Sequence, residues 1–211
     1  MTAPLVVTHP IVADKVRQLR DVTTSNADFL RLAREISRFV AYEAFRSTPV
    51  VATTVDTPVM KNAPAVRVDT EYVIVPVLRA GLGMSPSVQE VLPHHRVCLV
   101  GLRRDESTLQ PSVYLDGLPD RLEGAHVVVC DPMLATGGSL DCVLTMLEDR
   151  GAADLTVLCL IVARPGVDLV TARHPGVRIV AAALDEELND VGYITPGLGD
   201  AGDRLFGPPV R

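Results

Sequence analysis

One short segment, residues 127–139, constrains the fold of this chain more than any other. A buried strand, an acid, a glycine turn and a helix follow one another directly in it. The apolar run Val127–Cys130 is typical of a strand buried on both faces. Asp131 follows it, and the turn Thr136–Ser139 precedes apolar residues at helical spacing, namely Val143, Leu144 and Leu147. The segment predicts a strand, a tight loop and a helix that begins near Ser139.

The loop in this segment has the properties of a phosphate-binding turn. Backbone N–H groups at the start of a helix lack partners within the helix and attract anions. Gly137 and Gly138 let a ligand approach these groups closely, and the hydroxyls of Thr136 and Ser139 add donors. Asp131 would repel a phosphate, so we expect it to bind the hydroxyls of an adjoining ribose. An ordinary strand–turn–helix is the alternative, but the order of acid and glycine turn favours a sugar phosphate.

Beyond residue 71 the apolar pattern alternates between strand-like and helix-like segments. This alternation predicts an α/β fold in which helices flank a mainly parallel sheet. The chain has no Trp and only 4% aromatic residues, and an aliphatic core fits a sheet covered on both faces. Its 211 residues predict a single domain, residues 1–211. The expected strands are 72–78, 96–102, 125–131, 155–162 and 178–183, and the expected helices are 84–92, 139–150 and 166–174.

The first 70 residues predict two helices and a small accessory region. Pro10 marks the start of the first helix, because proline is favoured in the first helical turn. A second helix is expected from about Asn26, where an apolar stripe begins that consists of Phe29, Ala33, Ile36 and Val40. The segment Thr48–Val68 is rich in Val and Thr and is broken by three prolines, so it predicts short edge strands or a hairpin.

Charge and composition argue against several classes of function. The net charge is −6 and no basic cluster is present, so we expect no nucleic-acid binding. The longest apolar run, residues 155–163, is too short to cross a bilayer, and the N-terminus does not resemble a signal peptide. We therefore expect a cytoplasmic protein without membrane contact. The cysteines lack metal-ligand spacing, and we expect all four to be buried, reduced thiols, namely Cys98, Cys130, Cys142 and Cys159.

Two arginines follow expected strands at the same edge of the sheet as Asp131. In such sheets, ligands bind beyond the carboxyl ends of the strands. Arg79 follows the strand 72–78, and its guanidinium is a fork of donors that suits phosphate oxygens. Arg104 follows the next strand and precedes a polar stretch, residues 105–110, which predicts a flap over the site.

The segment Tyr193–Asp203 contains three glycines and one proline. This composition predicts a shaped loop without regular structure. Apolar residues at its ends, Tyr193, Leu205 and Phe206, favour a loop that is anchored on both sides. A flexible C-terminal connector is the alternative.

On these residues the chain resembles the type I phosphoribosyltransferases. The string Asp131-Pro-Met-Leu-Ala-Thr-Gly-Gly-Ser139 is similar to their ribose-phosphate loop. Most type I phosphoribosyltransferases have a second acid at the next position, whereas the uracil phosphoribosyltransferase family has a proline there, as this chain does at Pro132. Further segments resemble that family in the same order, namely Val75–Met84, Arg104–Pro111 and Gly192–Arg204. The resemblance extends from His9-Pro10 to Phe206-Gly207.

The resemblance implies the type I phosphoribosyltransferase fold with a small accessory hood or hairpin. It also implies the reaction of uracil with phosphoribosyl diphosphate (PRPP), which gives UMP and diphosphate in pyrimidine salvage. The catalytic residues implied are Asp131, Asp200 and Arg104. Those implied for PRPP are Arg79, Arg104, Asp131, Pro132, Met133, Leu134, Ala135, Thr136, Gly137, Gly138, Ser139 and Asp200. Those implied for uracil are Ile194, Gly199, Asp200 and Ala201, mainly through backbone groups.

The implied chemistry needs no protein nucleophile and no metal-ligand cluster. Mg²⁺ is the expected cofactor, bound mainly through PRPP, because Mg²⁺ commonly reaches such sites on substrate phosphates. Backbone donors and acceptors suit uracil, whose ring edge alternates acceptors with an N–H donor. Cytosine would leave a buried group unpaired, at a cost of about 1–3 kcal/mol.

Several questions stay open at this point. Arg103 stands where the family usually has Tyr, Glu187 where it often has Gly, and the region 48–68 is shorter than in relatives. The resemblance implies a homo-oligomer of at least two copies. Relatives differ in whether GTP activates them, so a GTP effector is left open. The alternatives for function are transfer to another base and a non-catalytic sensor of PRPP or UMP, and an RNA-binding sensor should show a basic face.

Overall fold

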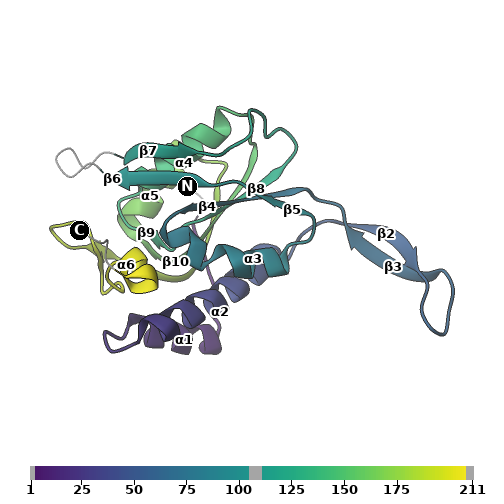
Figure 1. Ribbon diagram of the computed structural model, residues 1–211, viewed down its shortest axis with the longest axis horizontal. Helices are drawn as coiled ribbons and strands as arrows, with labels where there is room; N and C mark the ends of the chain where they lie inside the picture. Colours follow the sequence, from purple (N-terminus) through teal and green to yellow (C-terminus); the bar gives the residue numbers. More distant parts are fainter. Residues whose placement is uncertain (1–2, 105–110, 208–211) are drawn as a thin grey trace.

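A mainly parallel sheet forms the centre of the molecule, with helices on both faces (Figure 1). The computed structural model describes residues 3–104 and 111–207, without the side chain of Arg104. The strands lie side by side in the order β1 (Leu5–Val6), β11 (Arg178–Asp185), β10 (Asp154–Ala163), β8 (His126–Cys130), β4 (Tyr72–Leu78), β6 (Val100–Arg104) and β7 (Pro111–Asp116).

Short strands extend this sheet, and nearly all neighbours run parallel. β5 (His95–Val97) pairs with β4, and β9 (Met133–Leu134) pairs with β10. Among the described strands of this sheet, only β6 and β7 pair antiparallel. The expected α/β fold with a mainly parallel sheet is confirmed.

The helices cover the two faces of the sheet unequally. One face carries α1 (Pro10–Arg20), α2 (Asn26–Ala44) and α3 (Ser85–Val91), with the short α6 (Ala201–Phe206) against α2. The other face carries α4 (Gly138–Glu148) and α5 (Arg164–Arg173). A 3₁₀ turn, η1 (Ala80–Gly83), links β4 to α3. None of the helices described here is long and apolar enough to cross a membrane.

Each central strand contributes to two hydrophobic cores, because successive side chains point to opposite faces. In β4, Tyr72 and Ile74 pack toward α1–α3, whereas Val73 and Val75 pack toward α4 and α5. All four are buried. The continuous apolar runs in the sequence follow from this double coverage.

The two N-terminal helices form as the sequence predicts. Pro10 is the first residue of α1, and the side chain of His9 accepts a hydrogen bond from the N–H of Ile11 at 3.2 Å. The Oγ of Ser25 caps α2 by accepting from the N–H of Asp28 at 3.1 Å. The predicted stripe of α2 is fully buried, with 0% exposure at Phe29, Ala33, Ile36 and Val40.

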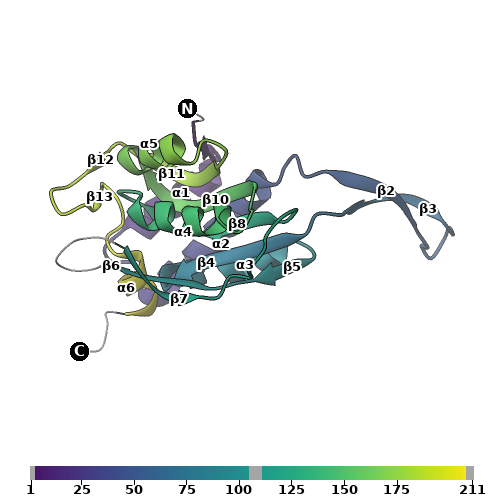
Figure 2. The same cartoon turned by 90° about the horizontal axis from the view of Figure 1, so that it is seen from above.

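The accessory region is a two-stranded antiparallel hairpin that projects from the body of the molecule (Figure 2). It consists of β2 (Val50–Val55) and β3 (Ala63–Val68), with Val50 opposite Val68. Every residue of β2 is exposed. The hairpin expected for this region is confirmed.

The expected strand 96–102 is interrupted. β5 and β6 continue the same register on β4, so Leu99 lies opposite Pro76. Pro76 has no N–H to donate, and this breaks the ladder between the two strands. Beyond β6, Pro111–Asp116 forms the additional antiparallel strand β7, and the expected flap 105–110 lies outside the described residues.

The prediction that Tyr193–Asp203 lacks regular structure is wrong. Ile194–Thr195 forms β13, which pairs antiparallel with β12 (Glu187–Leu188), so Glu187 lies opposite Thr195. Helix α6 begins inside the segment because the side chain of Asp200 accepts a hydrogen bond from the N–H of Asp203 at 2.8 Å. Gly197 and Gly199 lie between these two elements, whereas Gly202 lies within α6.

Candidate functional site

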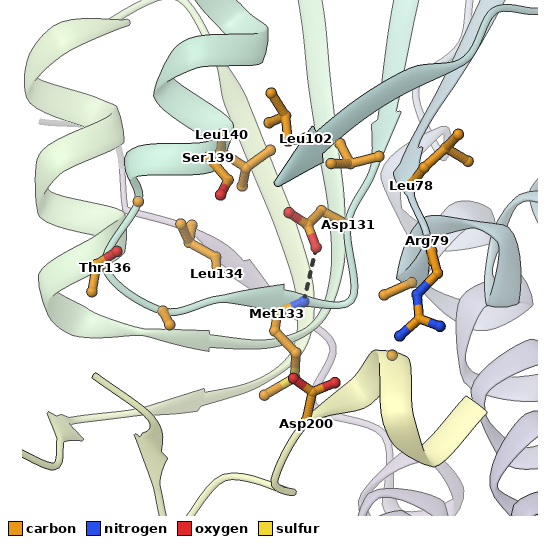
Figure 3. A pocket seen from close by; sticks show the side chains of 15 residues that line it. Leu78, Arg79, Leu102, Asp131, Met133, Leu134, Thr136, Ser139, Leu140 and Asp200 are labelled. Carbon is orange, nitrogen blue, oxygen red and sulfur yellow. Dashed lines mark hydrogen bonds between the residues drawn. The ribbon is translucent and has the colours of Figure 1, made fainter. Parts of the chain in front are cut away.

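A pocket of about 280 Å³ opens at the carboxyl ends of the central strands (Figure 3). It is formed by segments that are far apart in the sequence and that the fold brings to one edge of the sheet. Its lining consists of Val77, Leu78, Arg79, Ala80, Leu102, Asp131, Met133, Leu134, Ala135, Thr136, Gly137, Ser139, Leu140, Asp200 and Gly202. The pocket therefore includes most of the residues expected for PRPP.

One wall of the pocket is the turn that leads into α4. Gly137 is the N-cap of this helix and has φ +93°, a left-handed conformation that favours glycine. No side chain in the described part of the chain caps the first turn, so backbone N–H groups remain for a ligand beside the hydroxyls of Thr136 and Ser139. This arrangement suits a phosphate group.

Asp131 lies at the base of the pocket, directly after β8. Its carboxyl accepts a hydrogen bond from the N–H of Met133 at 3.4 Å, and Figure 3 shows apolar side chains near it, Leu102 and Leu140 among them. Burial raises the pKa of Asp131 to about 7, against the opposing effect of the Met133 N–H. The residue is only half-buried, so its carboxyl faces the pocket while protein atoms surround it closely. The carboxyl can accept hydrogen bonds from a ligand's hydroxyls.

Arg79 lies across the opening, directly after β4 and a cis peptide bond from Leu78. Its Nη2 lies 3.3 Å from Oδ1 of Asp203, and both side chains are nearly half exposed. Ion pairs with this exposure contribute little to stability, typically about 0–1 kcal/mol. An anionic ligand can therefore replace Asp203 as the partner of Arg79.

The C-terminal segment contributes only part of its predicted residues to the pocket. Asp200 and Gly202 line it, whereas Ile194, Gly199 and Ala201 do not. Ile194 and Ala201 are buried in the core, and Gly199 is exposed.

Two residues of the predicted phosphate segment also stay outside the lining. Pro132 is buried, and its carbonyl accepts hydrogen bonds from the N–H groups of Leu160 and Ile161, both at 3.0 Å. Gly138 is the first residue of α4. Pro132 thus ties the loop to β10.

The flap side of the pocket is described only in part. Arg104 ends β6, but its side chain lies outside the described part of the structure, as do residues 105–110. Arg103 is exposed.

Sequence reasoning did not identify the apolar lining residues Val77 and Leu102 or the role of Asp203. Asp200, followed three residues later by Asp203, is a pattern that predicts a helix with Asp200 as its N-cap.

Among the residues that the structure describes, the carboxylates that line the pocket are Asp131 and Asp200. Within residues 3–104 and 111–207, no group of three or more His, Cys, Asp or Glu side chains is arranged to hold a metal ion. The cysteines are unpaired thiols. Cys130 and Cys159 are buried as expected, whereas Cys98 and Cys142 are partly exposed, so the expectation of burial is wrong for these two. Asp131 and Asp200 are thus the described side chains that could supply carboxylate oxygens to a cation in this pocket.

A solved phosphoribosyltransferase shares the architecture of this chain. A purine phosphoribosyltransferase of Pyrococcus horikoshii matches with a TM-score of 0.51 at 17% identity, over 74% of this chain and 84% of that one. This match shows the fold alone. A protein of Aquifex aeolicus matches far more completely, with a TM-score of 0.92 at 34% identity over 99% and 100% of the two chains. The fold is thus that of the phosphoribosyltransferases.

Sequence comparison narrows the class further. The family model for uracil phosphoribosyltransferase matches residues 6–208. A uracil phosphoribosyltransferase of Clostridium botulinum is 46% identical over 207 residues, 98% of this chain and 99% of the relative. One of Kineococcus radiotolerans is 47% identical over 205 residues, 96% and 97% of the two chains. The chain belongs to the uracil phosphoribosyltransferase family, as its motifs predicted.

The raised pKa of Asp131 predicts a pH-dependent cost in stability. The folded protein keeps a proton on this carboxyl that the unfolded chain releases, so stability falls as the pH rises from about 4 to about 7. Asp131→Asn removes the charge. We expect the variant and the wild type to be similarly stable at pH 4, and the variant to be about 2–4 kcal/mol more stable at pH 8. Urea unfolding across this range measures the difference.

Asp120→Asn, a change at an exposed carboxyl outside the pocket, is the control and should follow the wild-type curve. Parallel curves for Asp131→Asn and wild type would contradict the argument.

Proposed function

We propose that this chain transfers ribose 5-phosphate from PRPP to N1 of uracil, forming UMP and diphosphate. The bond between ribose C1′ and the diphosphate oxygen breaks, the bond between C1′ and N1 forms, and N1 loses its proton. The observation that carries the proposal is the convergence of Arg79, Asp131, Asp200 and the Thr136–Ser139 turn on one pocket. Membership in the uracil phosphoribosyltransferase family supports the choice of base.

The residues divide the substrate between them by charge. The 5-phosphate binds the uncapped N–H groups at the start of α4, with the hydroxyls of Thr136 and Ser139. Asp131 accepts hydrogen bonds from the ribose hydroxyls. Arg79, released from Asp203, binds the diphosphate, and Arg104 has the same role by resemblance.

The positions of these groups suit a reaction in which charge separates. Positive charge develops on the ribose and negative charge on the leaving diphosphate as the C1′–O bond breaks. Fixed donors aimed at the diphosphate lower the barrier because they do not have to reorganise during the step. Holding both substrates in line supplies much of the remaining acceleration.

Mg²⁺ fits the oxygen donors of this pocket. Mg²⁺ is commonly held by one or two carboxylates together with substrate phosphates and waters, and Asp131 and Asp200 are the carboxylates of the lining. When bound, the ion neutralises charge on the diphosphate. The chain's own contribution is to orient PRPP so that its C1′ faces the incoming base.

We assign uracil to the backbone of the C-terminal segment, with Ile194, Gly199 and Ala201 as contacts and Asp200 beside them. Asp200 lines the pocket, so the segment adjoins the sugar-phosphate site. Backbone groups of fixed direction match the donor and acceptor pattern of uracil and mismatch that of cytosine.

An assay of the purified protein with PRPP and Mg²⁺ tests the function. Uracil, cytosine, hypoxanthine and adenine are offered in parallel, and nucleotide products are separated by chromatography. We expect UMP from uracil and no product from the other bases. Product from a purine would overturn the base assignment, and no product from any base would contradict the activity and favour a PRPP sensor.

Arg79→Ala tests the diphosphate contact. Loss of charge-assisted hydrogen bonds of about 1.5–3 kcal/mol predicts a decrease in kcat/KM for PRPP of about 10- to 100-fold. Steady-state kinetics with varied PRPP measure the effect. Arg96→Ala is the matched control, because Arg96 lies on β5 and outside the pocket lining. Equal kinetics of Arg79→Ala and wild type would remove Arg79 from the site.

We further propose that residues 1–211 act as one domain within a homo-oligomer of at least two copies. The exposed hairpin supports this, because it presents apolar side chains to solvent, namely Val50, Val51, Val55 and Val66. Light scattering should give at least twice the chain mass of 22.7 kDa. Replacing residues 54–64 with Asn-Gly joins Thr53 to Ala65, which lie opposite each other, and should lower the mass.

A monomeric wild type, or an unchanged mass after the hairpin is shortened, would contradict this proposal. The same preparation assayed with and without GTP decides whether that nucleotide is an effector.

A further inference from the structure

Two arginines from separate helices donate hydrogen bonds to the backbone of the C-terminal segment that we assign to uracil. Arg20 is the last residue of α1, and Arg204 belongs to α6. Arg20 Nη1 donates to the carbonyl of Gly197 at 2.8 Å, and Arg204 Nη1 donates to the carbonyl of Leu198 at 3.0 Å. Two consecutive carbonyls of the segment are therefore fixed by charged donors.

Asp185 completes the first of these contacts. It is the last residue of β11 and is only 7% exposed. Its two carboxylate oxygens each accept a hydrogen bond from Arg20 at 2.7 Å, a two-pronged ion pair. One of these two oxygens, Oδ2, also accepts a hydrogen bond from the N–H of Gly197 at 3.0 Å. The ion pair thus holds both backbone groups of Gly197.

Arg204 forms the second contact and anchors α6 to the first two helices. Its guanidinium donates to the carbonyls of Leu19 and Asp21, both at 2.7 Å, and lies 4.3 Å from the ring centre of Phe29. Arg204 therefore links α6, whose N-cap is Asp200, to the residues on either side of Arg20 at the end of α1.

The backbone at Gly197 has little freedom to adjust. Its φ is +56°, and a Cβ at this position would lie 2.1 Å from the carbonyl oxygen of Ile194. Three residues later the chain reaches Asp200, which lines the pocket, whereas Arg20, Asp185 and Gly197 do not. A shift at Gly197 is therefore transmitted to the pocket edge through a short, tightly turned segment.

We propose that Arg20 and Asp185 are positioning residues for the base: their ion pair sets the backbone of residues 194–200 and thereby the affinity for uracil, without touching the ligand. Arg204 supports the same segment from α6. The inference rests on the proposed function, because it takes residues 194–201 as the uracil site. Fixing a binding loop through a second layer of hydrogen bonds preserves its geometry when the ligand is absent.

Kinetics with each substrate varied separately test the proposal. The variants are Arg20→Gln, Asp185→Asn and the double variant, and the control is Arg17→Gln, an exposed arginine of α1 that pairs with Asp14. We expect Arg20→Gln and Asp185→Asn to raise the KM for uracil by about 10- to 100-fold. The KM for PRPP should change by less than about 3-fold. The double variant should be no worse than either single one, because the two residues act as one unit.

The outcomes separate this inference from the proposed function. If the wild type makes UMP but the KM for uracil does not move, or both KM values rise equally, the positioning role is overturned and the function stands. If the wild type makes no UMP, the function fails and the inference with it. Should Arg20→Gln not fold, Arg20→Lys decides, since lysine keeps the charge but cannot form the two-pronged pair. We then expect a smaller rise in the KM for uracil alone.

Discussion

The carboxyl of Asp131, held in a closely packed position, governs the energetics of this site. Burial raises the pKa of Asp131 to about 7, so the folded protein bears the cost of a poorly solvated charge as the pH rises through neutrality. No basic side chain of the described residues pairs with it. The hydroxyls of a bound ribose, or a cation that arrives with the substrate, can supply partners for this carboxyl. The free-energy cost of the poorly solvated Asp131 carboxylate is then offset when the ligand binds. Before the ligand binds, the stability of the rest of the fold has to exceed this cost.

The sheet provides that stability and also sets which groups meet. Residues of β8 pack alternately into two cores, which fixes the strand end from which Asp131 emerges. β4 is its parallel neighbour, with Pro76 opposite Cys130, so Arg79 and Asp131 leave adjacent strands at the same edge. A donor for diphosphate and an acceptor for ribose are thus neighbours because of strand register. The weak pair of Arg79 with Asp203 keeps the guanidinium near this edge while leaving it free to exchange partners.

The sequence could predict those features that depend on local pattern. The stripe of α2 from Phe29 to Val40 and the apolar run before Asp131 each carry their own periodicity, and the motif at 131–139 follows directly in the chain. Pro76 and Asp200 are single-residue signals for the break between β5 and β6 and for the start of α6. Both were missed, because Pro76 lies beside a continuous apolar run and Asp200 lies among closely spaced glycines. Which groups would support Gly197 could not be predicted, because Arg20 and Asp185 are separated by 165 residues and have no shared pattern.

This difference between local and distant contacts divides the site into two parts with different physical origins. The sugar-phosphate part is a strand, a loop and a helix in direct succession, so its geometry comes largely from one continuous segment. The part assigned to the base depends on ion pairs and carbonyl contacts that reach from α1 and β11 to residues 197 and 198. Substitutions in α1 can therefore alter the base segment while the phosphate turn keeps its shape. A fold arranged in this way can retain one sugar-phosphate site while its affinity for the base is tuned from outside the pocket.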